Sequence, residues 1–277
     1  MANITAAEVN KLRQMTGAGM MDCKNALVES NGDLEAAIDY LRKKGQKVAN
    51  KRADRESNEG LVIAKVNNDG TFGTITMLNC ETDFVAKNQE FIDLATAISD
   101  LANQHKTKSV DELSAIKMDD RTIGEHISDY MGKTGEKIQM CDYAFIEAPK
   151  VFAYNHNGNK LASMLGFNKS EAKEIDQVGK DVVMQIAAMS PVAIDKDDVD
   201  PVTIQREIEI GKEQARAEGK PEEMLEKIAM GKLNKFYKES TLLNQEFIKD
   251  SKKTIAQYLS ESDKDLKVVS FKRISVK

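Results

Sequence analysis

The chain has 277 residues and a formal net charge of −5, with 41% hydrophobic and 31% charged residues. A dedicated nucleic-acid-binding protein needs a basic surface that displaces counterions from phosphates, so this charge disfavours that class, and we expect no direct contact with nucleic acid. Three cysteines, no apolar run of about 18 residues and no signal or transit segment at the start favour a cytoplasmic protein with free thiols and no membrane contact.

Three short helices are predicted in the first 45 residues, and with the following linker they form a domain over residues 1–54. Thr5 and Glu8 have the spacing of a capping box, in which two side chains satisfy the first free amides of a helix. Glycine-containing breaks separate the helices, and Asp33 is placed to cap the third. Apolar residues recur on one face of each helix: Val9, Leu12 and Met15; Cys23, Ala26 and Leu27; Leu34, Ala37, Ile38 and Leu41.

Residues 42–55 carry seven basic side chains against one acidic residue, Asp54. Charge blocks of this kind are usually solvated, so we interpret the run as a helix end and linker. Attraction to an acidic partner surface is the alternative.

Two similar units follow the linker, each read as a hairpin and a helix. In the first, strands over 61–66 and 72–78 flank a turn at 67–70, and the next helix carries Phe91, Leu94, Ala95, Ile98 and Leu101. In the second, strands over 144–147 and 151–154 lead through a turn at 155–158 into 161–167, and the helix carries Val178, Val182, Ile186 and Met189. A last strand over 268–274 completes the second sheet.

These repeats predict a duplicated core, with one subdomain over residues 55–140 and the other over 141–277. Each unit is too small to bury both faces of its sheet alone, so we expect the two to pack together. Antiparallel strands with helices to one side make the fold class α+β.

A charged helical stretch over residues 201–238 interrupts the second unit, and we place the whole insertion at about 195–238. Gly219 and Pro221 end one helix and start the next, which predicts an antiparallel helical hairpin. Its seam is formed by Val202, Ile204, Ile208 and Ala215 on one arm and by Met224, Leu225, Ile228, Ala229 and Leu233 on the other. This seam could close on itself, contact a partner or pair with a second copy, and a homodimer through the core or the hairpin stays open.

Catalytic chemistry and cofactors are poorly supported by the sequence. The three histidines and three cysteines show no metal-ligand spacing, and a single buried thiol is more often a core residue than a nucleophile. Gly132, Lys133 and Thr134 resemble the end of a phosphate-binding loop, but Ile127 occupies the position of the required first glycine. We expect no cofactor, no metal and no nucleotide bound by this chain.

Met20 and Met21 are adjacent, so their side chains point about 100° apart on a helix and cannot both face a small core. One methionine is therefore expected at the surface, where its flexible apolar side chain suits partner recognition. A gap-filling role at the rim of the core is the equally weighted alternative.

Residues 79–88 lie between a predicted strand and a predicted helix. Thr82 or Asp83 could cap that helix while Phe84 or Val85 packs against its first turn. In the alternative, a carboxylate and a bulky aromatic side chain are both presented outward on a rigid turn. Residue chemistry alone leaves both interpretations open and slightly favours the first.

At residues 16–24 and 82–88 the sequence closely resembles the elongation factor Ts family, through long ungapped matches to its signatures. The resemblance covers essentially the whole chain. It implies a first domain similar to ubiquitin-associated domains, a duplicated core and an inserted coiled coil. It also implies a guanine-nucleotide exchange factor that acts on elongation factor Tu by protein–protein contact and not as an enzyme.

The resemblance also implies roles for individual residues. Phe84 would insert into an apolar pocket of the partner's G domain on the magnesium side, and Asp83 would help to disturb the elements that hold the ion and the phosphates. The remaining implied partner contacts are Thr82 and Val85 beside them, Met20, Met21 and Lys24 against a G-domain helix, Gly135, and His156 against a second domain of the partner.

Two departures from the family stand out. Thr134 occupies a position where isoleucine is common, so a partner contact there would lose apolar area. The chain ends at Lys277 without the extra C-terminal helical module of some members, so we expect a grip by the core alone or a larger share for the hairpin. The competing functions are a translation-associated RNA-binding or scaffold protein, which would use the basic run, and a cysteine-dependent enzyme.

Overall fold

The structure, a computed structural model, describes residues 4–52 and 54–276, without the side chains of residues 46 and 48–51. It begins with the helices α1 (Ala6–Thr16), α2 (Met20–Glu29) and α3 (Leu34–Lys51). The predicted capping box at Thr5 and Glu8 is confirmed, as is the cap at Asp33, whose carboxylate accepts a hydrogen bond from the Ala36 amide. The buried core of these helices is formed by Val9, Leu12, Ala18, Cys23, Ala26, Leu27 and Ala37.

The expectation that Met15 belongs to this core is wrong, because its side chain is 58% exposed. Steps of three residues drift by about 60° around a helix, so Met15 lies at the edge of the stripe that begins with Val9 and Leu12. It lines a cavity between this domain and the rest of the molecule.

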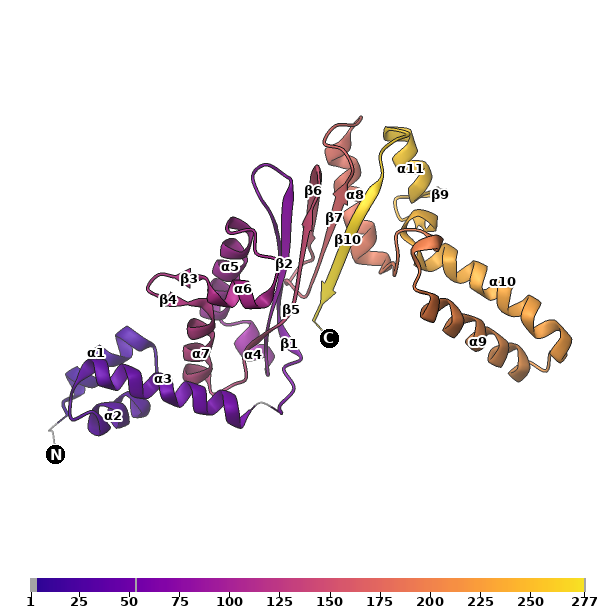
Figure 1. Ribbon diagram of the computed structural model, residues 1–277. Coiled ribbons are helices and arrows are strands. Elements are labelled where there is room, and N and C mark those ends of the chain that lie inside the picture. The colour runs from indigo at the N-terminus through magenta and orange to yellow at the C-terminus, as the bar shows by residue number, and fades with distance from the viewer. Residues whose placement is uncertain (1–3, 53, 277) are drawn as a thin grey trace.

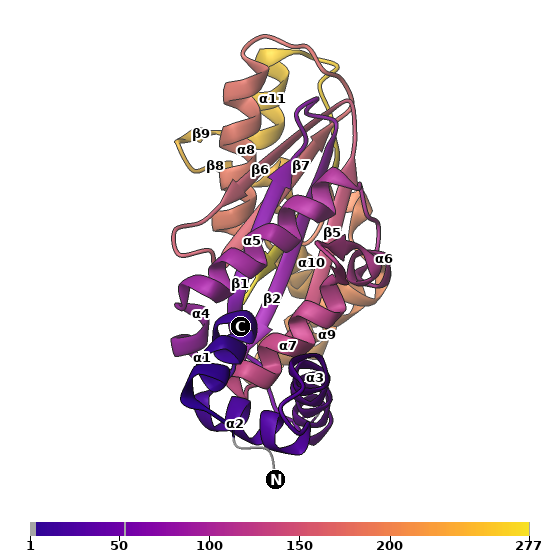
Figure 2. The same ribbon diagram turned by 90° about the vertical axis from the view of Figure 1, so that its left-hand side faces the viewer.

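The first core unit is a three-stranded antiparallel sheet with helices on one face. Its strands are β1 (Glu59–Val66), β2 (Phe72–Cys80) and β5 (Gln139–Glu147), in the order β1-β2-β5. Between β2 and β5 the chain forms α4 (Asp83–Ala86), α5 (Gln89–Gln104), α6 (Val110–Ala115), the short pair β3 (Lys117–Met118) and β4 (Arg121–Thr122), and α7 (Ile123–Thr134). Figure 2 looks onto the sheet face that α5 and α7 cover.

The second unit repeats this plan. Strands β6 (Lys150–Asn155), β7 (Leu161–Phe167) and β10 (Val268–Ser275) form a sheet in the order β10-β7-β6, which confirms the predicted last strand. Its helices are α8 (Ile175–Met189) and α11 (Ile255–Ser262), with the short pair β8 (Glu246–Phe247) and β9 (Asp250–Thr254) before α11. On α8, Val178, Val182 and Ile186 are buried as predicted, whereas Met189 at the end of the helix is exposed.

The assignment of residues 144–147 to the second hairpin is wrong. These residues belong to β5, which pairs with β2 and so crosses the predicted subdomain boundary at 140. The turn of the first hairpin lies between β5 and β6. There the Ala148 amide donates to the Thr71 carbonyl, and the Val151 amide donates to the Gly70 carbonyl. Strand β5 thus closes the first sheet as β10 closes the second.

The two sheets pack face to face, with helices outside each of them (Figure 1). The apolar layer between the sheets is formed by Val62, Ala64, Ile75, Ile146, Ala148, Val151, Ala162, Met164 and Ile274. Gly73 and Gly166 allow this close approach, since a Cβ on Gly73 would lie 2.9 Å from the Met164 sulfur. Each sheet therefore packs one face against helices and the other face against the sheet of the other unit.

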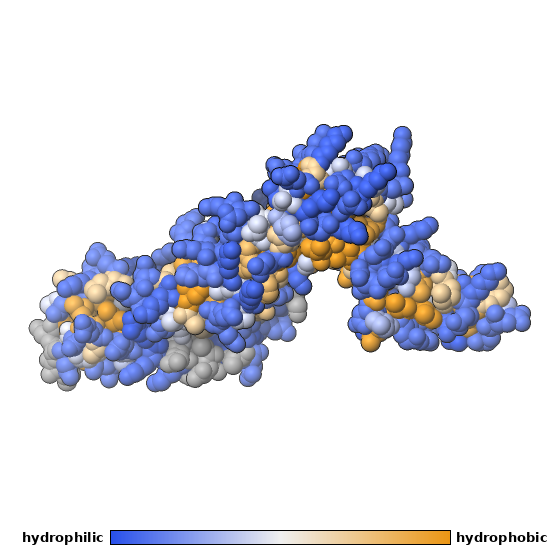
Figure 3. Space-filling model, turned by 45° about the horizontal axis from the view of Figure 1, so that its top comes forward, coloured by the Kyte–Doolittle hydropathy of each residue, from blue (hydrophilic) through white to orange (hydrophobic). Residues whose placement is uncertain are grey.

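The predicted helical insertion is present as α9 (Pro201–Ala217) and α10 (Glu222–Ser240), which project from the second unit (Figure 1). Its seam is narrow: Gly211 lies against Ala229, and Ala215, Leu225 and Leu233 are buried. The expectation that Val202 and Met224 belong to the seam is wrong, because both are exposed, and Figure 3 shows apolar side chains on the surface of this hairpin. None of the described helices is both long and apolar enough to span a bilayer.

Candidate partner-binding site

Residues 82–85, which we call the tip, form the turn from β2 into the single-turn helix α4. Thr82 caps this helix, since its hydroxyl accepts a hydrogen bond from the Val85 amide at 3.4 Å. Val85 packs against the core of the first unit, whereas Phe84 is 83% exposed. Cap and inward packing therefore belong to Thr82 and Val85, and the large aromatic side chain faces outward.

Asp83 does not cap the helix. Its carboxylate accepts a hydrogen bond from the Lys87 ammonium at 2.7 Å. This bond holds the pKa of Asp83 below its usual value. The carboxylate next to Phe84 is therefore already partly neutralised within the chain.

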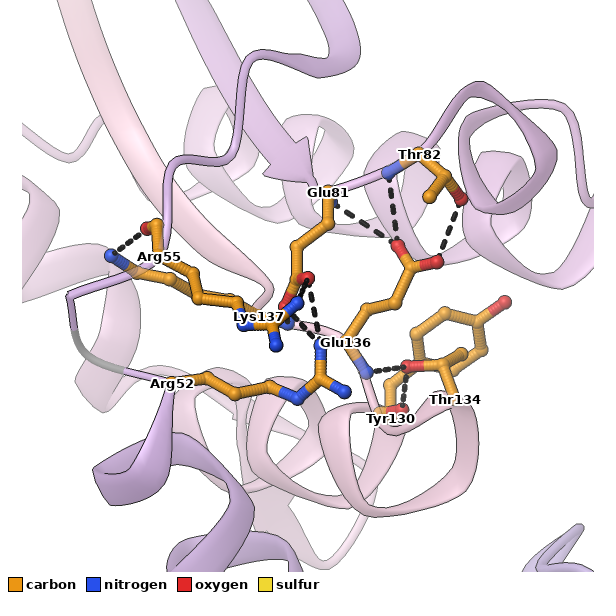
Figure 4. A network of polar contacts seen from close by, with 8 residues as sticks. All are labelled: Arg52, Arg55, Glu81, Thr82, Tyr130, Thr134, Glu136 and Lys137. Atoms are coloured by element: carbon orange, nitrogen blue, oxygen red, sulfur yellow. Dashed lines mark hydrogen bonds and ion pairs between the residues drawn. The ribbon is translucent and has the colours of Figure 1, made fainter.

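Glu136 binds Thr82 at the start of the tip (Figure 4). Its carboxylate accepts hydrogen bonds from the amides of Glu81 and Thr82, at 3.2 and 3.1 Å, and from the Thr82 hydroxyl at 2.7 Å. Hydrogen bonds to a charged acceptor are stronger than neutral ones, and here two backbone amides and one hydroxyl just before Phe84 donate to the same carboxylate. No pattern in the sequence had pointed to Glu136.

Glu81 forms a second anchor beside the tip. Its carboxylate accepts hydrogen bonds from the Arg52 guanidinium at 2.7 Å, from the Arg55 guanidinium at 3.4 Å and from the Lys137 amide at 2.6 Å (Figure 4). Burial opposes ionisation of this side chain, yet the Lys137 amide and Arg52 together hold the pKa of Glu81 below its usual value.

These contacts change the interpretation of the basic run. Arg52 and Arg55 pair with Glu81, Arg42 with Asp39, and Lys44 with Asp22. The side chain of Lys51 lies outside the described residues. A large part of the positive charge is therefore used inside the chain, which weakens the RNA-binding alternative.

The C-terminal end of α7 carries the residues that position Glu136. Gly135 caps the helix with φ 71°, and its amide donates to the Met131 carbonyl. The Thr134 hydroxyl donates to the Tyr130 carbonyl at 2.9 Å and accepts a hydrogen bond from the Glu136 amide at 3.2 Å. A helix C-terminus carries partial negative charge, so Gly132, Lys133 and Thr134 are poorly placed to bind phosphate.

The cysteine next to the tip is a structural residue. Cys80 is fully buried, and its thiol donates to the Thr82 carbonyl at 3.2 Å. Burial raises the pKa of Cys80 to about 12, which keeps it protonated and unreactive near neutral pH. This geometry disfavours a nucleophilic role for Cys80.

Met20, Met21 and Lys24 lie on the outer surface of α2, and we call these three residues the α2 face. We predicted one methionine at the surface, but both are there: Met20 is 54% exposed and Met21 is 64% exposed. The three small helices bury α2 only through Cys23, Ala26 and Leu27, so no core remains to cover either methionine. Lys24, four residues after Met20, is exposed beside it.

His156 is exposed in the turn between β6 and β7, where its ring nitrogen Nδ1 lies 3.0 Å from the Tyr154 hydroxyl. The same turn contacts β1. The Val62 amide donates to the Asn159 carbonyl, and the Lys160 ammonium pairs with the Glu59 carboxylate. Since Glu59 is the register partner of Cys80, the His156 turn approaches the sheet end that carries the tip.

The structure thus joins some of the predicted residues and leaves others apart. The tip and Gly135 are linked directly through Glu136. Helices α2 and α4 are separate elements that lie toward the same end of the molecule (Figure 2). A site of this kind consists of separate exposed contacts on a rigid body, which is typical of a protein-binding surface.

Comparisons with known proteins give consistent matches. The family model described as elongation factor TS matches residues 81–277. The chain is 56% identical over 277 residues to elongation factor Ts of Cytophaga hutchinsonii, with both chains covered completely. It is 50% identical over 276 residues to elongation factor Ts of Christiangramia forsetii, again over the whole of both chains. It is 51% identical to the Porphyromonas gingivalis protein of the same name, over 99% of this chain and 98% of that one.

Proposed function

The chain belongs to the elongation factor Ts family, and from this premise we propose that it releases GDP from elongation factor Tu by inserting Phe84 into the partner. Members of the family are nucleotide exchange factors for elongation factor Tu and not catalytic enzymes. In this chain we assign the contact to the exposed side chain of Phe84.

The observation that carries the proposal is the contrast between Phe84 and its support. The aromatic side chain is 83% exposed, while the residues before it are fixed by three hydrogen bonds to Glu136, two from backbone amides and one from the Thr82 hydroxyl. Burying such a ring in a partner contributes about 1.5–3 kcal/mol. Because the tip is already ordered, little of this free energy is lost to immobilising it on binding.

A rigid apolar insertion can act on a nucleotide site without touching the nucleotide. Accelerating release a thousandfold requires the barrier to fall by about 4 kcal/mol, which one well-buried aromatic residue with neighbouring contacts can supply. The coupling is reciprocal, so bound GDP weakens docking by the factor by which docking weakens GDP binding. GTP can therefore displace the protein by the same linkage.

The other exposed contacts complete the proposed interface. The family resemblance implies that the α2 face meets the G domain of the partner and that the His156 turn meets a second domain. We propose both contacts, because the two surfaces are exposed and at least partly apolar or aromatic. Thr134 is assigned an internal role instead, because its hydroxyl is used within the α7 terminus. Translation elongation places this activity in the cytoplasm, and the proposed reaction needs no cofactor on this chain.

The test is GDP release from elongation factor Tu loaded with a fluorescent GDP analogue and mixed with a fixed amount of this protein. We expect strong acceleration by the wild type and a loss of about thirtyfold or more for Phe84→Ala, the range of hot-spot truncations. Ile248→Ala is the matched control, since it shortens another exposed apolar side chain in the β8–β9 turn, far from α4 in Figures 1 and 2.

Failure of the wild type to accelerate release would contradict the exchange function for this chain. Full activity of Phe84→Ala would leave exchange intact and remove the tip from the mechanism. A loss of the same size in Ile248→Ala would show that the effect is not specific to the tip.

A further inference from the structure

Helix α3 crosses α7 at a contact between two glycines. A Cβ placed on Gly45 would lie 2.5 Å from the backbone oxygen of Ser128, and a Cβ on Gly132 would lie 3.0 Å from the Cα of Gly45. Distances this short exclude any side chain at Gly45 unless the helices move apart. The two backbones are therefore in direct contact, which only glycine permits.

Other contacts hold the first domain against the core beside this crossing. Lys133 reaches across from α7, pairs with Glu90 and lies over Gly17 at the end of α1. Beside it is a cavity of about 410 Å³, lined by apolar residues of both parts such as Met15, Leu41 and Leu94. Because this interface is incompletely filled, its geometry depends strongly on the glycine crossing.

The crossing also lies within a closed chain of contacts that reaches the tip. Helix α3 carries Gly45, and Arg52 just beyond its end is bonded to Glu81. Helix α7 carries Gly132, and Glu136 just beyond its end binds the tip. The same two helices that meet at the glycines therefore support residues 81–85 from both sides.

We infer that Gly45 and Gly132 are positioning residues that fix the α2 face relative to Phe84, so that both meet the partner as one rigid surface. Helix α3 transmits this placement, because its first half packs in the core of the three-helix domain through Ala37. The inference rests on the proposed function. It adds that the first domain docks in a set orientation and not as a unit on a free tether.

Rigid connection matters because two contacts held in register bind as one event. A mobile first domain would have to lose its freedom each time the second contact formed, and the gain in effective concentration would fall. Loosening the crossing should therefore weaken binding without changing what Phe84 does once the complex has formed.

The test is a graded set of glycine-to-alanine variants, with GDP release measured against the concentration of the full-length protein. Alanine favours a helix over glycine by about 1 kcal/mol, so α3 itself does not weaken in Gly45→Ala. We expect the half-saturating concentration to rise by about tenfold to a hundredfold in Gly45→Ala, with the maximal rate retained. Gly132→Ala should show a smaller rise, and Gly231→Ala on α10, where a Cβ meets nothing within 4 Å, should match the wild type.

A smaller active fraction in a merely destabilised protein would also raise the apparent half-saturating concentration, so the rise supports the inference only for a variant that is fully folded at the assay temperature. Thermal unfolding of each variant checks this directly, and Gly132→Ala provides the milder perturbation if Gly45→Ala does not fold. An unchanged half-saturating concentration in both folded variants would overturn the inference while the wild type still exchanges nucleotide. Absence of exchange by the wild type would instead reject the proposed function.

Discussion

Phe84 and Val85 are adjacent residues with opposite environments, and the difference is set by one turn of helix. Thr82 fixes the start of α4, Val85 then points to the core, and Phe84 is left in solvent. An exposed phenylalanine gives no stability to the free protein in return for its contact with water. The proposed function accounts for its place at the tip, because the partner would cover it.

Glu136 is the residue whose loss should affect the tip most without touching the partner. Glu136→Ala leaves the amides of Glu81 and Thr82 and the Thr82 hydroxyl without their shared acceptor. We expect exchange to fall by about tenfold to a hundredfold, since displacement of a functional group by about 1 Å costs up to that much. Stopped-flow GDP release measures the loss.

Glu136→Gln is the conservative variant for this experiment, because its amide oxygen still accepts part of these hydrogen bonds. Its activity should lie between that of the wild type and that of Glu136→Ala. Equal activity of all three proteins would show that the carboxylate does not position the tip.

Glu81 should make the stability of the first unit depend on pH. Its pKa is lower in the folded protein than in the unfolded chain, so its contribution is present above the unfolded value of about 4.3 and is lost as pH falls through the folded value. We expect the free energy of unfolding to decline less steeply below about pH 4.3 in Glu81→Gln than in the wild type. Urea unfolding across this pH range measures the difference.

Substitution of the exposed Glu171 by glutamine is the control for the lost charge. Parallel pH profiles for Glu81→Gln and the wild type would contradict the assigned interaction with Arg52 and the Lys137 amide.

At the scale of elements, α7 is the helix on which the site depends. Its start is a capping box between Thr122 and Glu125, its middle buries Ile123, Ile127 and Tyr130, and its end supplies the glycine crossing and Glu136. In the sequence, Ile127, Gly132, Lys133 and Thr134 of this helix were compared with a phosphate-binding loop, and Thr134 was also weighed as a partner contact. The capping-box spacing and the apolar residues at steps of four and three were the signals that could have located it.

Substitution of Gly135 measures how much the left-handed conformation at the end of α7 contributes to stability. Its φ of 71° lies in the left-handed region, but a Cβ there would meet no atom within 4 Å. Gly135→Ala should therefore cost about 1–2 kcal/mol from backbone conformation alone. Thermal unfolding measures the loss, and Gly135→Asn should be less affected because asparagine tolerates this conformation. Equal losses in the two variants would contradict a purely conformational cause.

Local patterns predicted the elements that depend on neighbouring residues. The capping box at Thr5, the hairpin turns and the two core-facing helices α5 and α8 all follow from short-range spacing. Contacts between distant residues left no such trace. Glu81 lies 55 positions from Glu136, and nothing in either local sequence indicates that the Glu136 carboxylate would bind the Glu81 amide.

At the scale of the whole molecule, duplication explains both a success and an error of the sequence analysis. Hairpin, helix and closing strand occur twice, and the closing strands β5 and β10 pair with β2 and β7. Strand β5 was placed in the wrong sheet because only a few residues separate it from β6, and neighbouring strands usually pair. Applying the repeat strictly would have made β5 the counterpart of β10.

The face-to-face packing of the two sheets gives the molecule a rigid centre. The tip projects from one end of the first sheet, and the His156 turn approaches the same end. The helical hairpin of α9 and α10 extends from the second unit in the direction away from the first unit (Figure 1). The contacts proposed for a large partner are therefore spread over an extended surface and not gathered in one pocket.

The most direct test is a saturation series of GDP release from elongation factor Tu with the wild type, Phe84→Leu and Phe84→Ala. If Phe84 acts on the nucleotide site by insertion, the maximal rate at saturating protein should fall stepwise with side-chain size. It should approach the spontaneous rate for alanine, even where binding is complete. Maximal rates that stay equal, with only the half-saturating concentration rising, would show that Phe84 anchors the complex but does not drive exchange.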